Sequence, residues 1–145
     1  MEEGDIFSFE NWTGDDFRWS SQGTPPWIID SENPFAGRNS IRTPNIGDNQ
    51  RTVLSFKGDF VSDELSFALK CSTELDWDRL KFYIDDTLMG SWSGIVDWKM
   101  VYFPIAAGTH TLTWEYLKDF ANSANLDSVW LDQIDLPISI SASLR

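Results

Sequence analysis

Apolar and polar side chains alternate with a period of two along most of the chain after residue 50. Such alternation is typical of antiparallel strands that turn one face to a core and the other to water. It predicts strands over 64–71, 79–84 and 109–116, and no stretch has the periodicity of an amphipathic helix. The core-facing positions are expected to be the odd ones in the first strand, the even ones in the second, and Leu112, Trp114 and Tyr116 in the third.

Turn signals divide this half of the chain into short segments. Asp85-Asp86 is a two-residue link of the kind found in tight hairpins, in which both residues adopt positive φ. Gly108 marks the turn before the 109–116 strand, and residues 92–98 are interpreted as a longer loop. The first fifty residues are richer in Gly, Pro, Asn and Asp and hold only short apolar pieces, so we expect loops and edge strands there.

The number and spacing of the strands indicate the fold class. About ten strands at short intervals, without helical segments, favour an all-β fold of two packed antiparallel sheets, and we predict a jelly-roll β-sandwich. A chain of 145 residues fits a single domain, 1–145, and can bury a core without disulfides. No N-terminal segment has the order of a signal peptide, and residues 1–4 do not resemble a natural start, so we interpret the chain as one module of a longer secreted protein.

Composition and charge exclude some partners. Eight Trp and ten Phe supply large areas for burial and candidate rings for stacking. The net charge of −12 repels phosphate backbones and anionic membranes, so nucleic acid is not expected as a partner. No apolar run approaches the length needed to span a bilayer, so membrane insertion is not expected either. The single cysteine, Cys71, is expected to pack in the core.

A carboxylate stands among apolar residues near each end of the chain. Glu10 follows Phe9 close to the N-terminus, and Asp132 follows Leu131 in the last predicted strand. If the first and last strands meet, the two carboxylates can share a cation, which oxygen ligands favour. Alternatively, Glu10 caps a turn and Asp132 accepts backbone hydrogen bonds, and no metal is bound.

The order of short motifs along the chain resembles that of cleaved-adhesin and MAM-like jelly-roll domains, concanavalin-like β-sandwiches of secreted bacterial proteins. Three features depart from the usual pattern: Asp86 stands where the hairpin commonly has Gly, Gln133 stands where a second acidic residue is usual, and paired cysteines are lacking. The motifs that carry the resemblance are 9–12, 27–30, 33–40, 46–50, 80–85, 92–94, 108–112, 114–116 and 130–134.

The resemblance implies a structural Ca²⁺ and an extracellular setting. The ion would be held by the carboxylates of Glu10 and Asp132 and by backbone carbonyls around Arg38, within 37–39. Calcium takes six to eight oxygen ligands in irregular geometry, which such a mixed set can supply. The resemblance also implies a secreted or cell-surface location and neighbouring domains in a longer chain.

Loop aromatics flanked by acids are the candidates for ligand binding. Trp77 lies between two aspartates, one of them Asp78, and Trp98 follows Asp97. Flat rings stack on sugar faces and carboxylates accept hydrogen bonds from hydroxyl groups, so Trp77, Asp78 and Trp98 are predicted to contact a glycan. The alternative is that these rings close the ends of the sandwich and bind nothing.

Catalytic patterns are weak in this sequence. The only histidine, His110, shares a strand face with Leu112 and is expected to pack there, and no zinc-ligand spacing surrounds His110 or Cys71. The Glu-x-Asp-x-Glu strand of jelly-roll glucanases has its nearest match at 132–135, which lacks that order. The chain is therefore not expected to be an enzyme.

Taken together, these patterns favour a calcium-stabilised, non-catalytic adhesion or carbohydrate-binding module of a secreted or cell-surface protein. Its expected partner is a glycan, or a protein of the extracellular matrix or cell surface. The first alternative is a structural spacer or self-assembling domain of a surface fibre or long adhesin. A glycan-cleaving enzyme is the second alternative.

Overall fold

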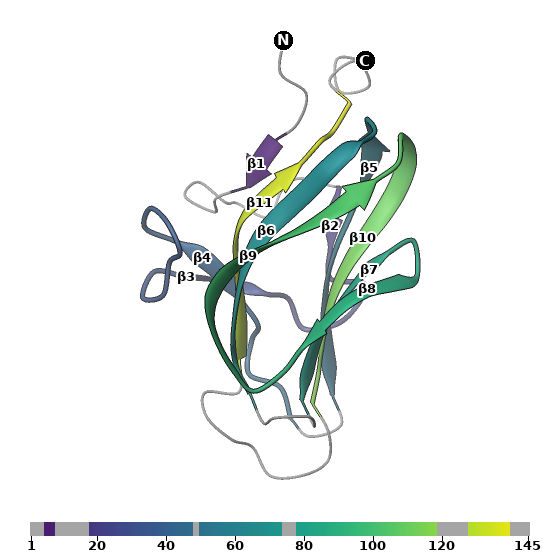
Figure 1. Ribbon diagram of the computed structural model, residues 1–145. Helices are drawn as coiled ribbons and strands as arrows, with labels where there is room; N and C mark the ends of the chain where they lie inside the picture. The colour runs from purple at the N-terminus through teal and green to yellow at the C-terminus, as the bar shows by residue number, and fades with distance from the viewer. Residues whose placement is uncertain (1–4, 8–17, 48–49, 74–77, 119–127, 140–145) are drawn as a thin grey trace.

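The computed structural model describes residues 5–7, 18–47, 50–73, 78–118 and 128–139 (Figure 1). Within these ranges all regular structure is β-structure, and no helix is present that could cross a membrane. The strands are β1 Asp5–Phe7, β2 Trp19–Ser20, β3 Ile28–Asp30, β4 Ser40–Arg42, β5 Arg51–Phe60, β6 Asp63–Ser72, β7 Arg79–Ile84, β8 Thr87–Trp92, β9 Ile95–Ile105, β10 Gly108–Leu117 and β11 Ser128–Leu136.

The strands form two sheets that face each other (Figure 1). The six-stranded sheet has the order β3-β4-β11-β6-β9, and β1 also pairs with β11; the five-stranded sheet has the order β2-β5-β10-β7-β8. Every strand pairing is antiparallel. The structure thus confirms the predicted all-β, two-sheet antiparallel sandwich, and the early strands β2 and β3 are edge strands as expected.

An aromatic cluster fills the space between the sheets. The Trp114 side chain on β10 is fully buried, and its ring centroid lies 5.1 Å from that of Phe82 and 5.5 Å from that of Phe67. Leu112 and Tyr116 on the same strand are also fully buried, which confirms the predicted inward face. Burial of each such side chain stabilises the fold by about 1.5–3 kcal/mol, so this cluster holds the two sheets together.

The single cysteine lies in this core. Cys71 is 1% exposed, as its place in the alternation predicted. Burial raises the pKa of its thiol to about 12. The side chain is therefore an uncharged apolar group at neutral pH and contributes packing.

The hairpin between β7 and β8 forms where it was predicted. Asp85 and Asp86 have φ of 50° and 71°, as a two-residue turn of this kind requires. The Asp85 carboxylate accepts a hydrogen bond from the Thr111 backbone N–H at 2.8 Å and contacts the His110 ring. Desolvation raises the pKa of Asp85, but the hydrogen bonds from His110 and Thr111 outweigh it and lower the pKa overall. The hairpin is thereby fastened to β10.

The predicted longer loop over 92–98 is wrong. Strand β8 continues to Trp92 and β9 begins at Ile95, so only two residues lie between them. The turn is fixed by Thr73, whose hydroxyl oxygen accepts the Gly94 N–H at 2.8 Å. The register between β6 and β9 shifts between Leu69 and Cys71, which breaks the period-two pattern in β9. This bulge concealed the strand from the sequence pattern.

Candidate functional site

The first and last strands meet, which is the condition under which the terminal carboxylates could share a cation. Strand β1 pairs with β11, with Ile6 opposite Asp135 and Phe7 opposite Ile134. Glu10 lies outside the described residues, so its place relative to Asp132 is not defined. What the structure establishes is that β1 and β11, the first and last described strands, lie side by side.

Asp132 is a fully buried carboxylate on the outer face of the six-stranded sheet. It lies at a β-bulge in β11, where Gln133 has φ of 48°. One carboxylate oxygen, Oδ2, accepts the backbone N–H groups of Phe35 and Ala36, each at 3.1 Å. The other, Oδ1, accepts the Gln133 N–H at 2.7 Å. These three N–H groups stabilise the ionised carboxylate in its buried position.

The described residues do not by themselves fit a calcium site. Calcium requires a shell of oxygen ligands, whereas Phe35, Ala36 and Gln133 each present an N–H donor to Asp132. Within the described ranges, no group of three or more His, Cys, Asp or Glu side chains could hold a metal ion. Arg38 lies exposed between β3 and β4. The site of Glu10, Arg38 and Asp132 therefore stays a prediction.

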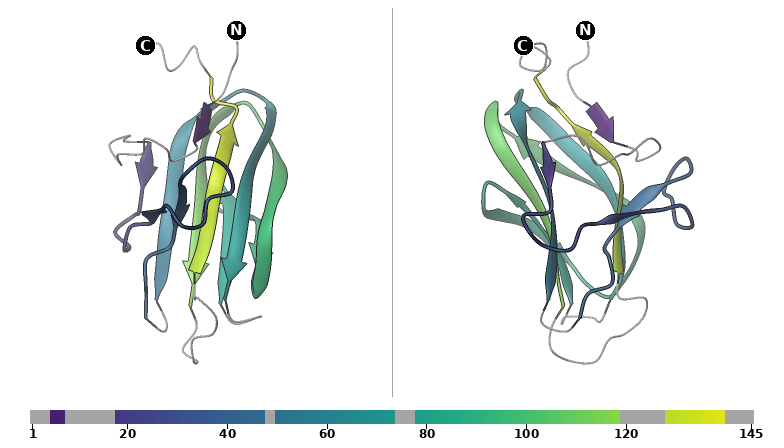
Figure 2. Two further views of the ribbon diagram at one scale, coloured as in Figure 1. Left: turned by 90° about the vertical axis from the view of Figure 1, so that its left-hand side faces the viewer. Right: turned by 180° about the vertical axis from the view of Figure 1, so that it is seen from behind.

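A second buried carboxylate, Asp30, holds the start of the segment that contains Phe35 and Ala36. It is 8% exposed and accepts hydrogen bonds from Trp130 Nε1 at 2.7 Å and from the Glu32 N–H at 2.7 Å. Asn33 donates to it as well. Desolvation raises the pKa of Asp30, but these hydrogen bonds together lower it below its ordinary value of 3.8. Residues 31–39 are thus held across the face of β11 (Figure 2).

The structure describes two of the three residues that were predicted to bind a glycan. Trp98 lies on β9, half-buried, with its ring centroid 5.6 Å from that of Phe35. Asp78 is 1% exposed, so its carboxylate does not face the solvent in the way that a glycan contact requires. Trp77 lies outside the described residues. Trp98 remains the one of the three that the structure places near the surface.

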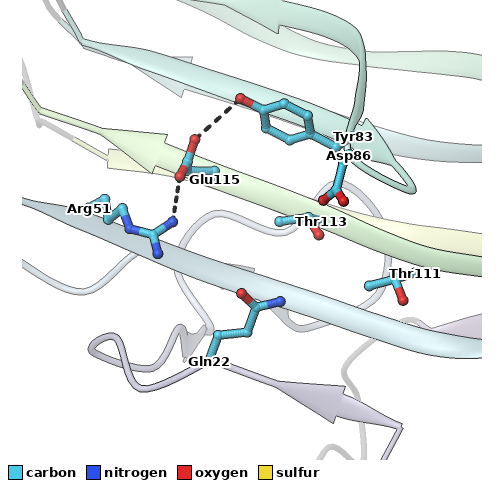
Figure 3. Close-up of a pocket in the computed structure, with 7 residues that line it drawn as sticks. All are labelled: Gln22, Arg51, Tyr83, Asp86, Thr111, Thr113 and Glu115. Atoms are coloured by element: carbon cyan, nitrogen blue, oxygen red, sulfur yellow. Dashed lines mark hydrogen bonds and ion pairs between the residues drawn. The ribbon is translucent and has the colours of Figure 1, made fainter.

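A polar hollow of about 230 Å³ lies on the outer face of the five-stranded sheet (Figure 3). Alternation on β10 turns its polar residues to this face, opposite the buried Trp114 side. The volume is smaller than the roughly 300–1,000 Å³ of pockets that enclose whole ligands, so this hollow suits part of a larger molecule. The lining residues are Gln22, Arg51, Tyr83, Asp86, Thr111, Thr113 and Glu115.

Glu115 organises the hollow. Its Oε2 atom lies 2.6 Å from Arg51 Nη1, and its Oε1 atom accepts a hydrogen bond of 3.4 Å from the Tyr83 hydroxyl (Figure 3). Desolvation, followed by the negative charge of Glu115, raises the pKa of Tyr83, although Arg51 opposes this. The phenol therefore stays protonated at neutral pH. The Glu115 carboxylate on β10 thus contacts Arg51 of β5 and Tyr83 of β7, the two strands that flank β10.

This hollow carries the chemistry of polyol recognition. Tyr83 provides a ring that is not part of the core, while Arg51 and Glu115 provide a donor and an acceptor for hydroxyl groups. Sequence reasoning did not identify this site. One signal was present, because Tyr83 is an aromatic residue at a polar-face position of the alternating 79–84 strand.

Comparisons with known proteins give similarity in structure only. No protein-family model matches the chain, and no curated protein matches it by sequence. The K2 cleaved adhesin domain of Lys-gingipain has a TM-score of 0.66 at 14% identity, with 94% of this chain and 98% of that domain covered. The CBM22-1 xylan-binding domain from Paenibacillus barcinonensis Xyn10C has a TM-score of 0.60 at 16% identity, with 95% and 97% covered.

A partial similarity involves a larger protein. The secreted serine protease VesC from Vibrio cholerae has a TM-score of 0.60 at 14% identity over 77% of this chain, which spans only 24% of VesC. At such identities, these similarities show the fold alone. They confirm the predicted jelly-roll β-sandwich and, at the level of the fold, the resemblance to cleaved-adhesin domains.

Proposed function

We propose that the chain is a non-catalytic carbohydrate-binding module of a longer secreted or cell-surface protein, and that it binds a glycan in the hollow of the five-stranded sheet. The arrangement of Tyr83, Glu115 and Arg51 carries this proposal. An oriented ring beside a paired donor and acceptor recognises the apolar face and the hydroxyl groups of a sugar. The hollow's volume of about 230 Å³ suits a unit within a longer polysaccharide.

The fold similarity supports a choice of first ligand. A protein with the same fold is a xylan-binding domain, and this chain covers 97% of its length. Xylan is also uncharged along its main chain, so the net charge of −12 does not repel it. A soluble neutral xylan is therefore the first probe.

The calcium site is part of this proposal. Support comes from the pairing of β1 with β11, which places the strand just before Glu10 beside the strand that carries Asp132. A bound ion that only the folded chain can hold would stabilise the domain by mass action. It would also suit a calcium-rich extracellular setting.

Isothermal titration calorimetry with soluble xylan tests the hollow. We expect Tyr83→Ala and Glu115→Gln each to weaken binding at least tenfold, a loss of about 1.4 kcal/mol or more. The matched control is Asp63→Ala, which removes an exposed acid from the other sheet and should bind like the parent. Equal binding by the parent and both hollow variants would show that the hollow is not the glycan-binding site.

Two further measurements distinguish the binding module from the alternatives, a glycan-cleaving enzyme and a structural spacer. Release of reducing sugar from xylan or another polysaccharide would replace the binding module with a glycan-cleaving enzyme. A chain that binds no glycan but self-associates in sedimentation experiments would instead support the structural spacer.

A further inference from the structure

The outer face of the six-stranded sheet carries aromatic side chains along β9. Tyr102 is 57% exposed and pairs with Ser66, which lies on the face opposite the inward Phe67. Trp98 lies four residues earlier on the same strand and contacts Phe35, which is 41% exposed. We call Phe35, Trp98 and Tyr102 the β9 strip.

The backbone that carries Phe35 is held rigidly. The fully buried Asp132 carboxylate accepts the Phe35 N–H itself, and Asp30 fixes the residues just before it. Lys70 Nζ donates to Asn33 Oδ1 at 3.4 Å, which ties the same segment to β6. A well-anchored segment that still exposes a phenylalanine ring loses little conformational entropy on binding, as a preorganised binding site requires.

The shape of the strip fits a linear ligand. The four residue steps from Trp98 to Tyr102 span about 13 Å along the strand, so one extended molecule can contact both rings. The strip runs along β9, and Phe35 extends it over the segment that Asp132 of β11 anchors. Aromatic rings at this spacing on one face of a strand are suited to the flat faces of successive sugars.

The edge of the sheet also disfavours a protein strand as the occupant. Strand β9 is an edge strand, and it contains Pro104, which has no N–H to donate to an added strand. The net charge of −12 disfavours a polyanion. A neutral polysaccharide matches the length, the charge and the aromatic content of the strip.

We propose that the β9 strip is a second glycan-binding site, on the sheet opposite the hollow, and that one copy of the chain binds two neutral polysaccharide segments at once. This inference rests on the proposed function for the class of ligand, but it concerns different residues. Two sites on opposite faces raise the apparent affinity for a polysaccharide matrix and allow one module to join two chains.

NMR titration of the full chain with xylohexaose tests the proposal. We expect two sets of shifted signals, one from the hollow around Tyr83 and Thr113 and one that includes the Trp98 indole N–H and the Tyr102 backbone. In Tyr83→Ala the second set should remain. Shifts confined to the hollow would overturn the second site and leave the proposed function intact.

The other outcomes are equally decisive. Shifts confined to the strip would support this inference and remove the hollow as the glycan site. Shifts at neither site with xylohexaose, and equally with cellohexaose, would overturn both.

Retention on insoluble xylan measures the consequence of having two sites. The double variant Phe35→Ala/Tyr102→Ala should bind at least tenfold more weakly than the parent, with an unchanged melting temperature. Leu88→Ala, which removes a side chain 50% exposed on the other sheet, is the matched control and should be retained like the parent. If sedimentation without ligand shows a dimer that the double variant loses, a second copy of the chain covers the strip and the proposal fails.

Discussion

The outer faces of the two sheets use carboxylates in different ways. On the six-stranded sheet, Asp30 and Asp132 are buried beneath residues 31–39, and backbone and side-chain N–H groups satisfy them. On the five-stranded sheet, the Glu115 side chain is 14% exposed and pairs with Arg51, which is 49% exposed. A buried carboxylate must use its hydrogen-bonding capacity on the protein, whereas one at the surface can exchange its partners for a ligand.

This contrast can be tested by changing each acid to its amide. The substitution keeps the shape of the side chain and removes the charge. We expect the buried acids to affect stability and Glu115 to affect binding.

The largest effect is expected at Asp132. Asp132→Asn loses the charge that three N–H groups stabilise and places an amide NH₂ among donors, so the free energy of unfolding should fall by about 3 kcal/mol. Urea denaturation measures this change. Asp63→Asn, an exposed acid on the same sheet, should change it by no more than about 0.5 kcal/mol. Similar values for the two variants would mean that the Asp132 carboxylate does not anchor the segment.

Calcium is expected to have the next largest effect on stability, and it tests whether Asp132 binds an ion as well as accepting hydrogen bonds. If the predicted ion is bound, calcium at 100 times its dissociation constant should stabilise the chelator-treated chain by about 2.7 kcal/mol, a rise in melting temperature of roughly 10 °C. A thermal melt with and without calcium measures it. Glu10→Gln should lose this response, while Glu115→Gln on the opposite sheet should keep it. An unchanged parent melt would leave Asp132 as a hydrogen-bond acceptor alone.

Asp30 should have a smaller effect that depends on pH. Its folded-state pKa lies below the ordinary value of 3.8, so its stabilisation is present above that value and is lost as the pH falls through the folded pKa. At neutral pH, Asp30→Asn should lower the free energy of unfolding by about 1.5 kcal/mol. Urea denaturation at a series of pH values should show this difference shrinking below about pH 4. A difference that is constant with pH would show that the charge of Asp30 is not responsible.

The smallest effect on stability is expected at Glu115. An ion pair with a half-exposed arginine contributes little, so Glu115→Gln should change the free energy of unfolding by no more than about 0.5 kcal/mol. The same variant should lose most of its binding to xylan. A large loss of stability would show that Glu115 has the same structural role as Asp30 and Asp132, and the two faces would then not differ.

Much of the fold could be predicted because its determinants are local. The alternation around Leu112 and Trp114 fixed the inward face of β10, and the Asp85-Asp86 link fixed a hairpin. Where a bulge interrupts the alternation, as in β9, the same reasoning placed Trp98 in a loop. A period-two pattern identifies a strand only while the register between strands is unbroken.

The candidate site could not be predicted in the same way, because its contacts are distant in sequence. Arg51 and Glu115 are separated by 64 positions, and Phe35 and Asp132 by 97. Nothing in the residues around Asp132 reveals that a segment from another part of the chain covers it. The acid itself was identified correctly as an unusual residue among apolar neighbours.

The sequence by itself determined the class of fold and the inward faces of the regular strands, because these follow from periodicity and turn chemistry. Only the tertiary structure decided which polar side chains gather in the hollow and which carboxylates are buried. Those outcomes depend on the order of strands in each sheet and on the path of residues 31–39 across β11. Pairing between distant strands brings such residues together, and no local pattern encodes that pairing.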